Sequence, residues 1–341
     1  MYFLGVKNSA IYDLSRGNIH TFPSDYFQLL ELLDKYSYSE LEVLSFDNKC
    51  EQDFYDFLSF LESNDMVNEL NKDDLLLFPK IDFLRKEDNC LIKNAIIDIK
   101  DVKLDFSKIF DELDSVSCEY VQIRQFGNTY SKKDIHEIIQ KSYNKSILGV
   151  EIILKHDKDT CDSAYRDLLI NNPIISALSI HSYPNDKLIY VNGTDEHTDI
   201  LGKKISFIST SINSSYHCGV INQQTLTPPS TGTMYTLQHF NGCMNKKISI
   251  DHNGFIKNCP SFTKNYGHID KENLINIASN KDFQSLWELN KDNIETCNLC
   301  EYRYACSDCR AYTENSKPLT KPEKCQYNPF TGEWIKKSGS S

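Results

Sequence analysis

The sequence predicts an α/β protein whose central region forms a parallel sheet. Three observations lead to this fold class. Apolar, β-branched runs recur about every 25–30 residues between positions 94 and 210, and helical stretches lie between some of them. A hairpin-and-helix pattern precedes this region, and a cysteine-rich segment follows it. We therefore expect the 341 residues to form three domains, over residues 1–92, 93–239 and 240–341.

The N-terminal region predicts a small domain made of one hairpin and three helices. Residues 9–22 (SAIYDLSRGNIHTF) read as two short strands around a turn at residues 15–17. Ser24 is placed to cap the first helix. Apolar side chains at helical spacing predict helices within residues 23–36, 37–46 and 51–67. This order is typical of a winged-helix-like domain, and a helical cap on the next domain is the alternative.

The central region predicts repeated βαβ units. Its strands are expected at NAIIDI (94–99), EYVQIR (119–124), GVEIIL (149–154), SALSIH (176–181) and ISFIST (205–210). The stretches DFSKIFDELDSV and SKKDIHEIIQKSY between them have helical patterns. Strand, helix and strand at this period indicate a parallel sheet, as a partial barrel or as an open α/β sheet.

The C-terminal region predicts a hairpin, one helix and a segment that needs covalent or metal staples. Residues 247–258 (KISIDHNGFIKN) read as a hairpin whose turn is Asn253-Gly254. Residues 271–290 have a helical pattern. The residues after 290 contain few apolar runs, and such a segment is commonly held together by metal sites.

Composition and charge narrow the function classes. No run of about 18 apolar residues occurs, so we expect no membrane span. The start of the chain lacks the pattern of a secretory signal, which favours the cytoplasm and reduced thiols. Residues 1–92 contain 8 Lys or Arg and 18 Asp or Glu, a net charge of −10. Because this acidic region repels phosphate backbones, nucleic acid is not an expected partner.

The twelve cysteines divide into scattered and clustered groups. Five are scattered, namely Cys50, Cys90, Cys118, Cys161 and Cys218, and we expect the first four to be small buried apolar side chains. Seven cysteines lie in the last ~100 residues, in the order Cys243-x10-Gly254-x4-Cys259, Cys297-x2-Cys300-x5-Cys306-x2-Cys309 and Cys325. Five residues between two knuckles are few for one zinc site, although the knuckles could serve different sites. Iron–sulfur clusters accept thiolates from distant segments, and a disulfide conflicts with the expected compartment.

This cysteine pattern resembles the SPASM domain, which is appended to radical SAM enzymes that modify ribosomally synthesised peptides. The spacing of Cys306 and Cys309 is one residue shorter than in the family pattern. The segments KISIDHNGFIKNCPS, CRAYTENS and CQYNPFTGEW, with SAIYDLSRGNIHTFPSDYFQLL, are similar to the SPASM-domain peptide maturases of grasp-with-spasm systems. That resemblance implies a degenerate partial radical SAM-like barrel, a precursor peptide and an ATP-grasp ligase as partners, and two [4Fe–4S] clusters.

The resemblance also implies how the cysteines are shared between the clusters. One cluster would use Cys243, Cys259 and Cys309 with an upstream fourth ligand, for which Cys218 is the nearest candidate and His217 the alternative. The other would use Cys297, Cys300, Cys306 and Cys325.

The radical SAM motif itself is missing. Such enzymes bind their catalytic cluster through C-x3-C-x2-C after the first barrel strand, whereas KDVKLDFSKIF follows NAIIDI here. We therefore expect no cleavage of S-adenosylmethionine, and no catalytic residue is assigned. The sequence leaves three hypotheses open: a peptide-maturation component with two clusters, a non-enzymatic adaptor that presents the precursor to the ligase, and a zinc protein without a peptide role. A G-x-x-x-x-G-K-[ST] loop is absent, so ATP chemistry would belong to the partner.

Overall fold

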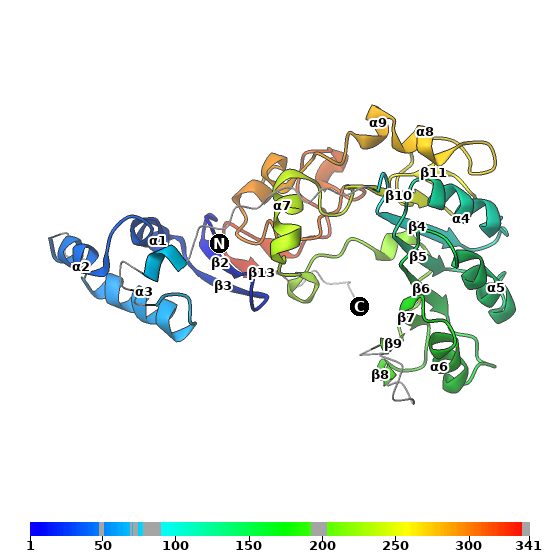
Figure 1. The fold of residues 1–341 in the computed structure, drawn as a ribbon, viewed down its shortest axis with the longest axis horizontal. Helices are drawn as coiled ribbons and strands as arrows, with labels where there is room; N and C mark the ends of the chain where they lie inside the picture. Colours follow the sequence, from blue (N-terminus) through cyan, green and yellow to red (C-terminus); the bar gives the residue numbers. More distant parts are fainter. Residues whose placement is uncertain (48–50, 69, 71–73, 78–89, 192–202, 336–341) are drawn as a thin grey trace.

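The computed structural model describes residues 1–47, 51–68, 70, 74–77, 90–191 and 203–335. Figure 1 shows an elongated molecule with the N-terminal helices at one end and an α/β unit at the other. The cysteine-rich segment lies between them. Cys50 and the SGSS sequence at the C-terminus lie outside the described residues.

The large sheet confirms the α/β class and the five predicted strands. It is mixed, with eight strands in the order β11-β10-β4-β5-β6-β7-β9-β8 among the described residues. The predicted runs correspond, within two residues, to β4 (Asn94–Ile99), β5 (Tyr120–Gln125), β6 (Gly149–Lys155), β7 (Ile175–His181) and β9 (Lys203–Ile208), all parallel. A sixth parallel strand, β10 (Lys247–Ile250), pairs with β4. The antiparallel edge strands are β8 (Lys187–Val191) and β11 (Ile256–Lys257).

Three helices cover one face of this sheet. They are α4 (Phe106–Ser115), α5 (Lys132–Ser142) and α6 (Asp162–Ile170), and Figure 1 shows them on the same side of the strands. Because β4 to β7 follow one another in space as in sequence, right-handed crossovers place every connecting helix on the same side. Asp105 caps α4, and Ser131 forms a capping box with Asp134 at the start of α5.

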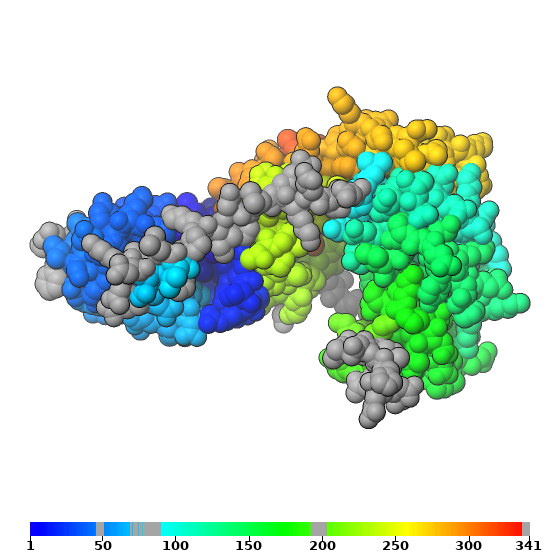
Figure 2. Space-filling view, viewed as in Figure 1, coloured from blue at the N-terminus to red at the C-terminus, as the bar shows by residue number. Residues whose placement is uncertain are grey.

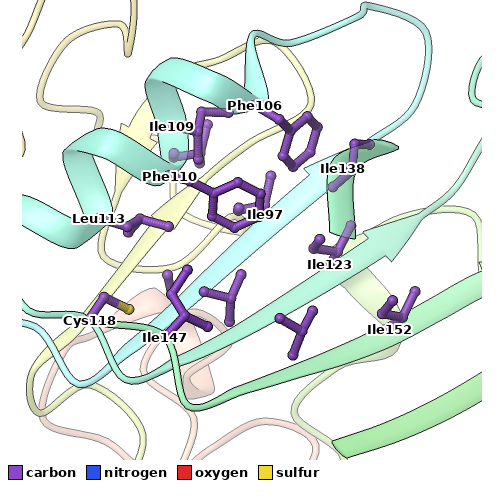
Figure 3. Close-up of a cluster of buried hydrophobic side chains, with 14 of the residues drawn as sticks. Ile97, Phe106, Ile109, Phe110, Leu113, Cys118, Ile123, Ile138, Ile147 and Ile152 are labelled. Atoms are coloured by element: carbon purple, nitrogen blue, oxygen red, sulfur yellow. The ribbon is translucent and has the colours of Figure 1, made fainter. Parts of the chain in front are cut away.

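The main hydrophobic core lies between these helices and the sheet. In Figure 3, Phe106, Ile109 and Phe110 of α4 point toward the isoleucines of β4, β5 and β6. Ile97 and Ile123 are almost completely buried in this layer. Cys90 and Cys118 are also buried, as predicted, whereas Cys161 is exposed at the start of α6, so that prediction was wrong. A helix N-terminus faces solvent, which explains the exposure of Cys161.

The opposite face of the sheet is polar. Strand side chains alternate between faces, so Asp98 points away from the helices that Ile97 contacts. Asp98 is paired across the sheet with Arg124, and the guanidinium donates to its two carboxylate oxygens over 2.7 and 3.0 Å. Both side chains are buried. This face therefore contains an ion pair held within the protein.

The N-terminal unit has the predicted hairpin and three helices. Its strands are β1 (Tyr2–Phe3), β2 (Asn8–Asp13) and β3 (Asn18–Pro23), and its helices are α1 (Phe27–Leu33), α2 (Tyr38–Asp47) and α3 (Glu51–Ser63). Gly17 makes the β2–β3 turn with φ of +69°. The predicted cap at Ser24 was wrong, because its hydroxyl donates to the Gly5 carbonyl oxygen over 3.0 Å. Ser24 instead begins a 3-10 turn (Ser24–Tyr26) that connects β3 to α1.

The N-terminal sheet lies between its own helices and the cysteine-rich segment. Phe22 packs with the helices, whereas Tyr12 packs on the other side with the region around Tyr304. The Tyr12 hydroxyl donates to the Glu301 carbonyl oxygen over 2.7 Å, and the Val6 N–H donates to the Leu299 carbonyl oxygen over 3.1 Å. These contacts join the N-terminal sheet to the cysteine-rich segment.

The cysteine-rich segment contains short elements joined by turns. The predicted hairpin is β10 and β11, with Gly254 at φ of +86° in its turn. The predicted helix over residues 271–290 is two short helices, since Asn280 caps a new one. The helices are α7 (Thr231–His239), α8 (Leu274–Ala278) and α9 (Lys281–Gln284), and a two-stranded sheet joins β12 (Tyr327–Asn328) and β13 (Glu333–Trp334). Further 3-10 turns cover Asp74–Leu77, Ser215–His217, Gln223–Thr225, Lys291–Asn293, Cys297–Leu299 and Glu314–Ser316.

Within the described ranges, no helix combines the length and the apolar character needed to cross a membrane.

Candidate metal centres

The structure gathers one group of cysteines at the open face of the sheet, beside β10. We call Cys218, Cys243, Cys259 and Cys309 the first thiol set. The pKa of Cys259 is raised to about 12, chiefly by burial, and the charges of Cys243 and Cys218 contribute to the rise. Burial likewise raises the pKa of Cys309, again with contributions from Cys243 and Cys218. The four sulfurs therefore lie within electrostatic reach of one another, although Cys218 itself is exposed.

A second group lies between the first one and the N-terminal unit. We call Cys297, Cys300, Cys306 and Cys325 the second thiol set. All four line one pocket, whose apolar walls include Ile221, Leu226, Tyr327 and Trp334. Burial raises the pKa of Cys297 to about 11 and that of Cys300 well above its ordinary value, and nearby Cys306 adds to both shifts. The second set is thus a more enclosed site than the first.

Backbone contacts hold the two sets side by side. Ile221, three residues after Cys218, forms a parallel bridge with Cys325. Between Cys306 and Cys309, Asp308 adopts a left-handed conformation with φ of +63°. Cys306 belongs to the second set and Cys309 to the first, so the chain passes from one set to the other across this residue.

A partly buried lysine accompanies the first set. The Lys247 ammonium donates to the Cys243 sulfur over 3.4 Å. Burial lowers the pKa of Lys247, but the charges of Cys243, Cys259 and Cys218 raise it more, so the net shift is upward. Among the described residues, Lys247 forms no ion pair with a carboxylate. Its positive charge is therefore available to the sulfurs.

The second set has an equivalent lysine. The Lys291 ammonium donates to the Cys297 sulfur over 3.7 Å and to Asp308 over 2.8 Å. Lys291 is only 5% exposed. Burial lowers its pKa, whereas Cys306, Asp308 and Cys297 raise it, and the net shift is upward. Each thiol set thus contacts a cation that water does not solvate freely.

The raised thiol pKa values show how these cysteines would have to change in order to bind a metal. A buried cysteine with a raised pKa stays protonated at neutral pH, so it is neither a free nucleophile nor a charged ligand. Metal binding replaces that proton and releases it to solvent. A centre bound by four thiolates would carry negative charge, which the neighbouring lysines could offset.

Disulfide bonds, a single metal ion and a histidine ligand are the other arrangements that the sequence leaves open. The cysteines of both sets form no disulfide bonds. In the described part of the chain, no three His, Cys, Asp or Glu side chains meet closely enough for one metal ion. In a [4Fe–4S] cube each thiolate binds a different iron, so four thiols need not meet at one point. His217 is paired with Asn213 over 3.3 Å, and its neighbour Cys218 is the residue that interacts with the first set.

A cavity elsewhere does not involve these cysteines. It has a volume of about 800 Å³ and lies between α5 and α6, where Lys132, His156 and Asn172 are among the lining residues. The loop after β4, residues 100–105, contains no cysteine either. The chemistry-bearing thiols are therefore confined to the cysteine-rich segment and to Cys218.

Sequence reasoning missed the two lysines and the glycine beside Cys218. Lys247 follows Cys243 by four residues and Lys291 precedes Cys297 by six, but a lysine in a sequence normally indicates an exposed side chain. Gly219 has φ of +87°, and a Cβ atom there would lie 2.8 Å from the Cys309 sulfur. Only the Cys-Gly dipeptide could have suggested that the backbone approaches a sulfur.

Comparison of this sequence with protein-family models and with curated proteins finds no match. The geometry alone defines the candidate site: two neighbouring four-thiol sets, each beside a lysine, of which Lys291 is buried and Lys247 partly buried.

We predict that Gly219→Ala lowers the metal content of the first set. A left-handed alanine costs about 1–2 kcal/mol, and its methyl group would push against the Cys309 sulfur, 2.8 Å away. Gly17→Ala is the matched control, because Gly17 also has positive φ (+69°) but no neighbouring atom within 4 Å. Iron per chain after anaerobic purification should fall toward half in Gly219→Ala and stay unchanged in Gly17→Ala. Equal iron in the two variants would refute the role of Gly219.

Proposed function

We propose that this chain is a component of ribosomal-peptide maturation that binds two [4Fe–4S] clusters and a precursor peptide without cleaving S-adenosylmethionine. One observation carries the cluster assignment: eight cysteines fall into two sets of four, and each set contacts its own lysine, partly buried at the first set and buried at the second. The resemblance of the cysteine pattern to SPASM-domain maturases supplies the biological context. An ATP-grasp ligase would be the partner that activates a carboxylate.

The positive charges of Lys247 and Lys291 support the assignment of iron–sulfur clusters. A [4Fe–4S] core bound by four thiolates is an anion, and a buried anion needs a nearby cation or hydrogen-bond donors. Lys247 and Lys291 supply the cations, and the Asp308 N–H supplies a donor to the Cys306 sulfur over 3.4 Å. Such clusters have no open iron, so they supply electron transfer or structural support rather than substrate activation.

The central sheet supports a barrel that has lost its radical chemistry. Its parallel strands β4, β5, β6, β7 and β9 follow sequence order, with all three connecting helices on one face, as in a partial (β/α) barrel. The residues after β4, where a radical SAM enzyme would carry three cysteines, include none. On the sheet face opposite the helices, Asp98 and Arg124 instead form an ion pair. This unit is proposed to support the peptide and the first thiol set.

The N-terminal unit is proposed to be a winged-helix-like recognition domain for the leader of the precursor. Both faces of its three-stranded sheet are covered, one by helices and one by the cysteine-rich segment. A peptide can therefore join this sheet only along an edge, where it gains main-chain hydrogen bonds. The net charge of −10 over residues 1–92 favours a leader with Lys or Arg. Figure 2 shows a hollow between the segment around α7 and the α/β unit, toward which a bound precursor could extend.

A second function, that of a non-enzymatic adaptor, is favoured by the docking of the N-terminal sheet. Arg303 donates to the Leu4 carbonyl oxygen over 2.8 Å and to the Cys300 carbonyl oxygen over 3.0 Å. The Arg303 side chain thus links the loop after β1 to the backbone at Cys300 of the second thiol set. In this role the clusters would serve only to fix the surface that presents the precursor to the ligase.

Mass spectrometry of the precursor distinguishes the two functions. The cluster-loaded full chain is incubated with a candidate precursor peptide, with and without an ATP-grasp ligase and with an added electron donor or acceptor. A maturase with its own chemistry changes the peptide mass before the ligase is added. An adaptor changes nothing alone but increases the yield of the ligase product. A peptide that the chain neither binds nor alters would contradict both functions.

A further inference from the structure

Four buried polar side chains form a network between the two thiol sets. Asp308 is its centre: one carboxylate oxygen accepts from Lys291 and from Arg310, each over 2.8 Å, and the other accepts from Asn241 over 2.6 Å. These side chains are 1–5% exposed. Each of the three donors therefore replaces water that the Asp308 carboxylate has lost.

The network ends at a cysteine of each set. At one end, the Asn241 side-chain oxygen accepts from the Cys243 N–H over 3.0 Å. At the other end, Lys291 donates to the Cys297 sulfur over 3.7 Å. A continuous path of four hydrogen bonds thus joins the first set to the second without passing through solvent. Asp308 also lies in the chain between Cys306 and Cys309, so the covalent and the hydrogen-bonded connections meet at one residue.

The charges of the network are unequal. Lys291 and Arg310 contribute two cations against the single carboxylate of Asp308, which leaves a net charge of +1 in a buried space. Because burying an unpaired charge is costly, this excess needs an anion nearby. The sulfur that Lys291 contacts belongs to the second set, and a cluster bound there would be that anion.

The network also fixes geometry. Asn241 accepts from both Cys243 N–H and Met244 N–H, which holds the start of the segment that carries Cys243. The same Asn241 side chain donates to Asp308, whose left-handed backbone directs Cys309 toward Cys243. Filling the first set would hold Cys243 and Cys309 in place, and with them Asn241 and Asp308. Asp308 in turn holds the Lys291 ammonium beside the Cys297 sulfur of the second set.

We propose that the Asn241–Asp308–Lys291 network couples the two thiol sets, so that filling one set with a cluster favours filling the other. This inference rests on the proposed cluster-binding function. Asp308 acts here as a positioning residue, because it contacts Lys291 and Asn241 rather than a cluster. Energetic coupling between two sites in a protein typically changes affinity about 5- to 150-fold.

Native mass spectrometry during anaerobic reconstitution tests the coupling. The metal-free full chain receives ferrous iron and sulfide in steps, and the species with no cluster, one cluster and two clusters are counted. In the native chain the one-cluster species should remain scarce at half loading. In Asp308→Asn, which keeps the shape but removes the charge, it should increase about fivefold or more relative to the two-cluster species.

Two further variants make the outcome decisive. Asp282→Asn removes an exposed carboxylate that pairs with Lys264 and should load like the native chain. Asn241→Ser breaks the link to Asp308 but leaves the Lys291–Asp308–Arg310 ion pairs, so it serves where Asp308→Asn does not fold. It should also accumulate the one-cluster species. A native chain that accumulates this species as strongly as both variants would refute the coupling while two clusters still bind, whereas a native chain that takes up no iron and sulfide would overturn the proposed function with it.

Discussion

Replacing Cys309 with alanine is expected to reduce the iron of the anaerobically purified chain from about eight atoms to about four. Cys309 belongs to the first thiol set, where Cys243 and Cys218 contribute to its raised pKa. Removing one of four thiolates leaves a cluster with an incomplete set of ligands, while the second set keeps its own four. Iron and sulfide assays, together with the visible absorption band, would each show about half the native signal.

Three further variants test whether Cys309 and Cys325 belong to different sets. Cys325→Ala should also halve the iron, but by emptying the second set, whose pocket Cys325 lines. Cys161→Ala should leave the iron unchanged, because Cys161 is exposed at the start of α6 and belongs to neither set. The double variant Cys309→Ala/Cys325→Ala should contain almost none. Native iron content in Cys309→Ala would refute the division of the eight cysteines.

Asp98→Ala is expected to destabilise the α/β unit by about 3–5 kcal/mol, the usual result of breaking a buried ion pair. The Arg124 guanidinium would remain buried without its carboxylate, and water cannot replace the lost partner. Burial lowers the pKa of Arg124, whereas Asp98 and, to a smaller extent, Cys218 and Cys259 raise it. Arg124 is therefore also within electrostatic reach of the first thiol set. The measurement is urea unfolding of the metal-free full chain, followed by circular dichroism.

Two comparisons show whether the effect comes from the buried charge. Asp162→Ala breaks a more exposed ion pair with Lys187 and should cost no more than about 1 kcal/mol. Asp98→Leu combined with Arg124→Met should recover much of the loss, because apolar residues leave no unpaired charge. If Asp98→Ala cost no more than Asp162→Ala, the ion pair would not be an important part of the structure.

The strands of the central sheet were predictable because each is a self-contained apolar run. β4, β5, β6, β7 and β9 lie within two residues of the predicted bounds. The edge strand β8 was not predicted; it is five residues long, and Val191 is its only buried residue. The break between α8 and α9 was missed because the apolar spacing continues across Asn280, although that side chain starts a new helix. Local patterns thus identified the buried strands better than the edges and breaks.

The cysteines of the candidate site could be predicted from spacing, but their surroundings could not. Lys291, Asp308 and Arg310 look like ordinary surface charges in the sequence, and only the fold shows that they are buried together. Asn241 lies 67 residues before its partner Asp308. Partners so distant in the chain leave no local pattern. The position of the N-terminal sheet on the second set was hidden for the same reason, since Tyr12 and Glu301 are 289 residues apart.

The measurement that tests the account most directly is the content of iron, sulfide and zinc per chain after purification without oxygen. Two clusters require about eight irons and about eight sulfides, with negligible zinc. That result would support the proposed cluster-binding function and allow the electron-transfer properties of both sets to be measured. About two zinc ions per chain without sulfide would contradict it, and the cysteine-rich segment would then be a metal-stabilised scaffold.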